Sequence, residues 1–315
     1  MNVTTWILQV LEILAAVAAA PLFLGWVNQC RAWLQNRNAP SVLQPYRNIR
    51  KLFHKEAVIA SNASQLFRLA PYIVFGTMVT AAAVIPSLGT RLPFTRAADA
   101  IALVGLLATA RVFLSLAAMD VGTAFGTLGA RREMMVGFLA EPALLMVIFV
   151  ASMISATTAL PDISERLATQ ALGLYPSLAF TAVAFTMVLL AENARIPVDN
   201  PSTHLELTMI HEALLLEYSA RHLALMEWAS ALKLFNYACI GFALFVPWGA
   251  AMQQTPLALL AAIPALALKL LIAGAGLAFI ETVSAKLRVF RAPEFLATAF
   301  LFAVLGLLVH LLLGA

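Results

Sequence analysis

Eight long apolar blocks constrain the fold of this chain more than any other feature of its sequence. Each block has about 20 residues or more, which lets a helix rising 1.5 Å per residue cross about 30 Å of hydrocarbon. We place the spans near Trp6–Val27, Leu69–Leu88, Ala97–Met119, Met134–Leu160, Leu172–Ala191, Ala229–Gly249, Pro256–Ile280 and Phe295–Leu313. The sequence therefore predicts an all-α, polytopic membrane helix bundle with about eight transmembrane helices.

The charge content of the chain supports a membrane environment. Hydrophobic residues make up 62% of the 315 positions and charged residues only 11%, whereas a soluble domain has roughly a quarter of its residues charged. The blocks are also too long for the short alternating strands of a membrane barrel. We expect residues 1–315 to form a single integral membrane domain.

Lysine and arginine gather in alternate connections between the spans. The first, third, fifth and seventh connections hold most of them, whereas the even connections hold only Arg91, Arg96 and Arg166. The positive-inside rule therefore puts the odd connections in the cytoplasm and both chain termini outside. This distribution explains the formal charge of +4 without a nucleic-acid partner.

Two of the predicted cytoplasmic connections are long. Residues 28–68 form a basic loop in which Tyr46–Lys55 has an apolar side and is suited to an amphipathic helix at the membrane interface. Residues 192–227 form an acidic loop with a helix-compatible stretch at Thr203–Tyr218. Neither loop is large enough for a soluble domain, so we expect any catalytic site outside the membrane to belong to another chain.

The cysteine content argues against a redox centre in this chain. Cys30 and Cys239 lie far apart and no Cys-x-x-Cys occurs. A cuboidal iron–sulfur cluster usually needs four thiolates, and zinc needs four ligands or three plus water. We predict no catalytic residue, cofactor or metal site here.

Charged side chains inside the spans are candidates for a proton path. Each costs about 2.5–3.5 kcal/mol at a helix centre on insertion scales, so such residues face protein or water and pair with one another. Glu133, Gly137 and Glu141 follow at i, i+4 and i+8 and face nearly one way. The glycine leaves room there for water or for a neighbouring helix.

Other charges complete this candidate group. We expect Glu192 to arrive from the end of the fifth span, and Lys233 to be the balancing cation. Arg111 cannot exchange protons at ordinary pH and is better suited to a fixed counter-charge. The alternative is that all these charges form static pairs that hold the bundle together.

Two stretches carry a resemblance to a known family. The first is QNRNAPSVLQPYRNIRKLFHKE, from Gln35 to Glu56, and the second is ENARIPVD, from Glu192 to Asp199, followed by Glu206-Leu207 and Glu217-Tyr218-Ser219. Together they resemble the subunit 1 family of respiratory complex I. The chain looks most like the branch found in group 4 NiFe hydrogenases and formate hydrogenlyases.

The resemblance implies a function and a set of partners. It implies a membrane subunit that anchors a peripheral redox arm and couples electron transfer to proton translocation. The implied partners are hydrogenase-like or complex I-like catalytic and iron–sulfur subunits, which would carry iron–sulfur clusters and in some complexes NiFe, together with antiporter-like membrane subunits and membrane lipids. The implied location is the inner membrane of a bacterium or archaeon.

The charged residues of the spans and loops, together with the role that the resemblance implies, give two sets of predicted site residues. The predicted proton relay comprises Glu133, Glu141, Glu192, Asp199, Glu206, Glu217 and Lys233. The predicted docking surface for the peripheral arm comprises Arg37, Gln44, Arg47, Lys51, Lys55 and Arg195.

Three other functions remain open at the level of sequence. A quinone-site membrane subunit of a complex I-type oxidoreductase would have a lipid-open cavity beneath the first loop. A free-standing secondary transporter would show internal repeats, and the sequence shows none. A purely structural anchor would use the buried charges only as pairing elements. Ser202 and His204 stand where acids commonly occur in the complex I family, which weakens a direct transfer of the quinone site.

Overall fold

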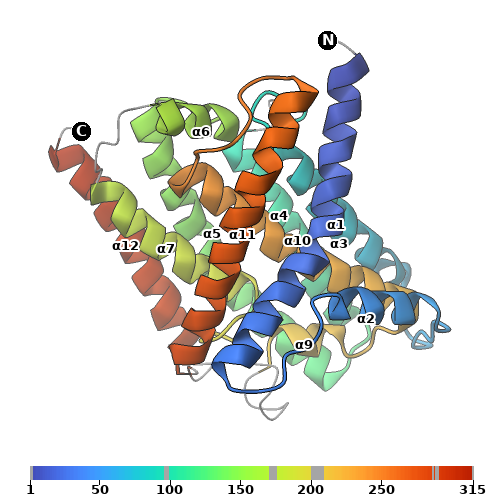
Figure 1. Cartoon of the computed structure of the whole chain (residues 1–315). Coiled ribbons are helices and arrows are strands. Elements are labelled where there is room, and N and C mark those ends of the chain that lie inside the picture. Colours follow the sequence, from blue (N-terminus) through green and yellow to red (C-terminus); the bar gives the residue numbers. More distant parts are fainter. Residues whose placement is uncertain are drawn as a thin grey trace.

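All regular elements of the computed structural model are helices, as the sequence predicts (Figure 1). The structure describes residues 3–95, 99–169, 176–199, 209–285, 287 and 291–313. Within these ranges the strand-like pairing is a single isolated bridge between Gly89 and Ala251. The prediction of an all-α membrane bundle is confirmed.

Seven of the described helices are long and apolar enough to cross a membrane. They are α1 (Val3–Leu34), α3 (Gln65–Val84), α4 (Ala100–Asp120), α5 (Ala124–Ser155), α10 (Ala220–Phe245), α11 (Pro256–Val283) and α12 (Ala292–Leu313). An eighth apolar helix, α7 (Pro176–Glu192), has 17 residues and follows residues 170–175, which lie outside the described ranges. These eight helices correspond in order to the eight predicted spans.

The helix ends differ from the predicted span ends. Helix α1 continues to Leu34, and α10 begins already at Ala220. Hydropathy marks where hydrocarbon ends, whereas a helix stops only where its backbone hydrogen bonds stop. The N-terminal starts of α3 and α5 are fixed by N-capping. The side chains of Ser64 and Thr123 each accept a hydrogen bond from a backbone N–H of the first turn.

The two chain ends lie on the same side of the bundle. Figure 1 shows the start of α1 and the end of α12 at the upper side, with α2 (Gln44–Phe53) and α9 (His211–Leu215) at the lower side. The amphipathic helix α6 (Leu160–Thr169) lies at the upper side. A chain that crosses the membrane an even number of times has both ends on the same side. The assignment of that side to the outside of the cell stays a prediction.

Helix α2 begins and ends two residues earlier than the predicted amphipathic stretch Tyr46–Lys55, and it lies across α1 and α10. Ile49 is buried against the bundle, whereas Arg50 and Lys51 are exposed. The Tyr46 hydroxyl donates a hydrogen bond to the carbonyl oxygen of Ala18 in α1. The chain before α2 passes so close to α1 that a Cβ at Gly25 would lie 2.8 Å from the carbonyl carbon of Val42. These contacts fix α2 over the lower end of the bundle.

Candidate functional site

Arg111 on α4 contacts three carboxylates inside the bundle. Its Nη1 lies 2.6 Å from Glu141 Oε1, and its Nε lies 3.4 Å from Glu133 Oε1, both on α5. Its Nη2 pairs with Oε1 of Glu192, the last residue of α7. Three sequence-predicted relay residues therefore meet at one guanidinium, which offers five N–H donors in a fixed fork.

Lys233 on α10 completes this group. Its Nζ lies 3.0 Å from Glu192 Oε2, so Glu192 pairs with a different cation through each of its two oxygens. We call these five residues the Arg111 cluster: Arg111, Glu133, Glu141, Glu192 and Lys233. The three carboxylates outnumber the two cations, so the fully ionised cluster carries a formal charge of −1.

Gly137 makes the contact between α4 and α5 possible. A Cβ at this position would lie 2.7 Å from Arg111 Cδ and 2.9 Å from Arg111 Cζ. The glycine between the two glutamates was expected to leave room for water or for a neighbouring helix. The structure shows that the guanidinium of the neighbouring helix fills this space.

Glu141 is the most exposed member of the cluster, and Lys233, with 18% of its side chain exposed, is the next. The exposed fraction of the side chain is 5% for Arg111, 9% for Glu133 and 1% for Glu192, but 35% for Glu141. Phe138 and Leu145, three residues before and four residues after Glu141, are exposed as well and share its face of α5. The charge cluster therefore opens onto the outer, membrane-facing surface of α5.

A cavity of about 520 Å³ lies at the lower end of the bundle, between α1, α2, α9 and α10. Its walls combine apolar side chains with the polar or charged side chains of Asn28, Asn48, His211, Glu212 and Glu227. Burial raises the pKa of the Glu212 carboxyl, and the nearby Asp199 raises it further. Such a mixed lining suits water or an amphiphilic molecule.

A second, smaller cavity lies between the large cavity and the Arg111 cluster. It measures about 30 Å³ and is lined by Arg111, Glu133 and Lys233 of the cluster. It shares His211, Leu215 and Ser230 with the large cavity. A space of this size has room for one water molecule, and the charged side chains of the cluster can serve as its polar partners within an otherwise largely apolar wall.

Asp199 lies apart from the Arg111 cluster and fixes the start of α9. Its Oδ2 accepts hydrogen bonds from the backbone N–H groups of Ile210, at 3.2 Å, and His211, at 3.0 Å. The side chain is buried. Asp199 thus joins the motif that follows α7 to the short helix that lines both cavities.

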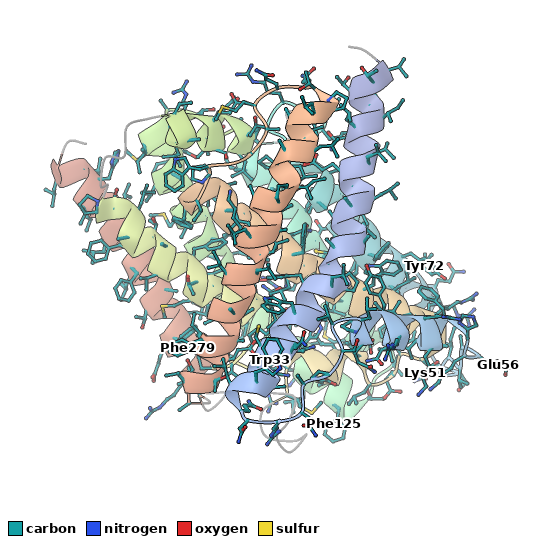
Figure 2. The ribbon with its side chains drawn as sticks, in the orientation of Figure 1. Trp33, Lys51, Glu56, Tyr72, Phe125 and Phe279 are labelled. Carbon is teal, nitrogen blue, oxygen red and sulfur yellow. The ribbon has the colours of Figure 1, made fainter. Side chains whose placement is uncertain are left out.

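The predicted docking residues divide into exposed and buried ones. Arg37, Gln44, Arg47, Lys51 and Lys55 are exposed. Figure 2 shows Lys51 at the edge formed by α2, pointing away from the bundle. Arg195 differs, because only 13% of its side chain is exposed and its Nη1 lies 3.1 Å from Glu281 Oε1 on α11.

Two predicted relay residues lie elsewhere. Glu206 lies outside the described residues. Glu217 follows α9 in the turn toward α10 and is half-buried, and none of the ion pairs between described residues joins it to Arg111, Lys233 or Arg221. The relay role of both residues stays a prediction.

Sequence reasoning missed a second charged junction. Glu281 is buried and pairs with Arg195 and, at 3.4 Å, with Arg31 at the end of α1. The sequence marks Glu281 as a charge near the end of a span, but no spacing rule connects it to Arg31, 250 positions away. His211 was also missed, because a histidine in a polar loop has no signal that places it beside a cavity.

Among the described residues, no group of three metal-ligating side chains is suited to hold a metal ion.

Comparison with known proteins finds a family and relatives that match most of the chain. A family model described as NADH dehydrogenase matches residues 7–312. Formate hydrogenlyase subunit 4 of Escherichia coli K12 is 32% identical over 296 residues, covering 94% of this chain and 95% of the relative. Hydrogenase-4 component C of the same organism is 35% identical over 256 residues, covering 80% of this chain and 79% of the relative.

The fold is also similar to a solved structure. A chain of the membrane-bound sulfane sulfur reductase, an archaeal respiratory membrane complex, superposes with a TM-score of 0.83 at 20% identity. The match covers 96% of this chain and 98% of that chain. At this level of identity the likeness concerns the fold.

Proposed function

Because the chain belongs to the NADH dehydrogenase family, we propose that it is the membrane subunit of an energy-converting complex of the hydrogenase or formate hydrogenlyase type. It is a multi-pass membrane protein, in keeping with an inner membrane of a bacterium or archaeon. In our proposal it anchors a peripheral redox arm and couples electron transfer in that arm to proton translocation. Iron–sulfur clusters and, where present, NiFe belong to the partner subunits.

The observation that carries this proposal is the excess carboxylate of the Arg111 cluster. A buried charge without a partner is costly, and water is the medium that would stabilise it. Three carboxylates facing two cations therefore favour binding one proton. Because like charges raise one another's proton affinity, a change of charge nearby alters how tightly that proton is held.

The surroundings of the cluster give it two openings. The small cavity leads from Glu133 and Lys233 toward the large cavity under α2. Glu141 opens on the opposite side, onto the surface of α5. A proton that enters from the large cavity and leaves past Glu141 would reach a neighbouring membrane subunit, for which we propose the antiporter-like partners.

The exposed basic residues of the first loop support a docking role. Arg37, Arg47, Lys51 and Lys55 lie at the side of the bundle where the peripheral arm would bind. Their charges also favour anionic lipid headgroups. Arg195 would act differently, holding the segment after α7 against α11 through Glu281.

Glutamine variants of the cluster test the proposal in the purified complex. Glu141→Gln and Glu133→Gln keep the side-chain shape and remove one titratable group. A relay predicts that each variant assembles but loses ion translocation in proteoliposomes, with redox turnover partly kept or stalled. Full translocation by both variants would leave the chain a structural anchor.

The large cavity supports a second candidate, a quinone-site membrane subunit. A cavity beneath the first loop is what that function requires, and its mixed lining suits an amphiphilic ring and tail. This candidate predicts that turnover of the purified complex depends on added quinone. Turnover that is unchanged after lipid and quinone extraction would exclude it.

A further inference from the structure

We propose that His211 is the proton-transfer group between the large cavity and the Arg111 cluster. The inference rests on the proposed function and names a residue that the motifs of the chain did not indicate. His211 lines both the cavity of about 520 Å³ and the cavity of about 30 Å³. Of the three residues shared by the two cavities, it is the one with a titratable side chain; Leu215 and Ser230 are the others.

The imidazole has a free position for a proton or a water molecule. Its Nε2 is buried and makes no hydrogen bond to any described residue. A buried polar atom without a partner is costly unless water reaches it. The small cavity provides room for such a water, and the same cavity touches Glu133 and Lys233.

The backbone of His211 is fixed from two sides. Asp199 accepts a hydrogen bond from its backbone N–H at 3.0 Å, and Arg132 on α5 donates to the carbonyl oxygen of Met209 at 2.9 Å. Helix α9 also packs closely on α5, because a Cβ at Gly129 would lie 2.9 Å from the Ala213 Cβ. A rigid placement is what a proton-transfer residue needs to keep its donor and acceptor in reach.

The charges around His211 make its proton affinity responsive to the cluster. Burial, Lys233 and Arg195 lower the pKa of His211 and Asp199 opposes them, with the result that the pKa is about 4. The other charged groups that line its cavities are Arg111, Glu133, Glu212 and Glu227. The resting imidazole is therefore neutral, and a neutral imidazole is both a donor and an acceptor.

The transfer step is balanced within these groups. A hydrated proton in the large cavity binds the unprotonated ring nitrogen of His211, and the proton on the other ring nitrogen passes to water in the small cavity. The ring is then neutral with its proton on the opposite nitrogen, and a flip of the ring about its Cβ–Cγ bond restores the starting arrangement of donor and acceptor. That water delivers a proton to a carboxylate of the cluster. A loss of positive charge at Lys233 would raise the proton affinity of His211, which links the step to the state of the Glu192–Lys233 pair.

Chemical rescue in the purified, reconstituted complex tests this role. His211→Ala should lower the rate of ion translocation by about a hundredfold, the lower end of what a positioned proton-transfer group contributes to a rate. Added imidazole, which fits the cavity and the space left by the side chain, should restore at least half of it. His222→Ala is the matched control, since His222 is a buried histidine of α10 that lines neither cavity.

Translocation is read as membrane potential, with the parent complex in the same imidazole concentration as the reference. If His211→Gln translocates ions normally and imidazole does not restore translocation in His211→Ala, the side chain only fills space and the inference is overturned. Normal translocation by His211→Ala, beside loss in Glu141→Gln, would overturn the inference and leave the proposed function intact. Full translocation by Glu133→Gln and Glu141→Gln would instead remove the proposed function itself.

Discussion

The guanidinium of Arg111 lies in the space that a side chain at Gly137 would occupy, with the Cδ of Arg111 2.7 Å from where that Cβ would stand. One arginine thereby reaches Glu133 and Glu141 on α5, one on each side of the glycine, as well as Glu192 on α7. The packing of two helices and the assembly of the charge cluster depend on the same missing side chain.

Gly137→Ala should disturb the cluster. The new methyl group overlaps atoms of a buried arginine, and overpacking of this kind costs about 1–3 kcal/mol. We expect lower thermal stability of the complex and reduced ion translocation per turnover. Gly105→Ala on α4 is the control, because a Cβ there meets no atom within 4 Å; it should match the parent or be slightly more stable. Equal behaviour of the two variants would contradict the proposed packing.

Arg111→Met should be more severe than any single glutamate variant. It leaves Glu133 and Glu192 buried without their shared cation, and breaking a buried ion pair costs about 3–5 kcal/mol. We expect little of the chain to be recovered in assembled complexes, measured by native gel and immunoblot. Arg111→Lys should be intermediate, because an ammonium is compact and cannot contact three carboxylates in the same way. An Arg111→Met complex as stable as the parent would refute the central position of Arg111.

Two substitutions of Asp199 separate the effect of its charge from the effect of its hydrogen bonds. Asp199→Asn keeps an oxygen that can accept from the N–H groups of Ile210 and His211, so the complex should assemble while coupled translocation falls. Asp199→Ala also removes the acceptor of the Ile210 and His211 N–H groups, and leaving a buried donor without a partner costs about 1–3 kcal/mol. Thermal unfolding of the complex should therefore distinguish the two variants. If the redox arm is lost already in the asparagine variant, the segment is a docking surface.

Charge reversal on α2 tests the docking surface. Arg47→Glu with Lys51→Glu should weaken retention of the redox arm and make it sensitive to salt, since exposed charges interact over about 10 Å at 0.1 M ionic strength. The measurement is the amount of arm that stays with the membrane after washing at increasing salt. Arg221→Glu, an exposed arginine outside this surface, should retain the arm as the parent does. Equal loss in both would indicate a general charge effect.

Reporter fusions test the orientation. A reporter after Ala315 should score as external, and one inserted near Asn62 as cytoplasmic, because lysine and arginine gather on the α2 side. The opposite pattern would reverse the assignment of every loop, including the side from which the redox arm binds.

The sequence predicted the parts of the structure that depend on local patterns. Span positions follow from hydropathy, and α2 follows from the apolar Ile49, Leu52 and Phe53 between basic residues. The common face of Glu133 and Glu141 follows from helical periodicity. Lys233 was expected beside this group because it is a lone lysine in an apolar span, and the structure places it on Glu192.

Relationships between distant helices could not be predicted. The three contacts of Arg111, the junction of Arg31 with Glu281, and the position of His211 between two cavities depend on how helices pack. Arg195 shows the same limit, because its motif indicated a docking residue and its side chain is mostly buried against Glu281. No single-sequence pattern carries the information on which basic residues remain accessible.

The exposed carboxylate of Glu141 also bears on how long the chain survives in the cell. An unassembled copy would present this group to lipid, between Phe138 and Leu145, where a charge is costly. A neighbouring subunit that covers α5 would remove that cost. We therefore expect orphan copies to be unstable and to be degraded first, so that the abundance of this chain follows the supply of its membrane partner.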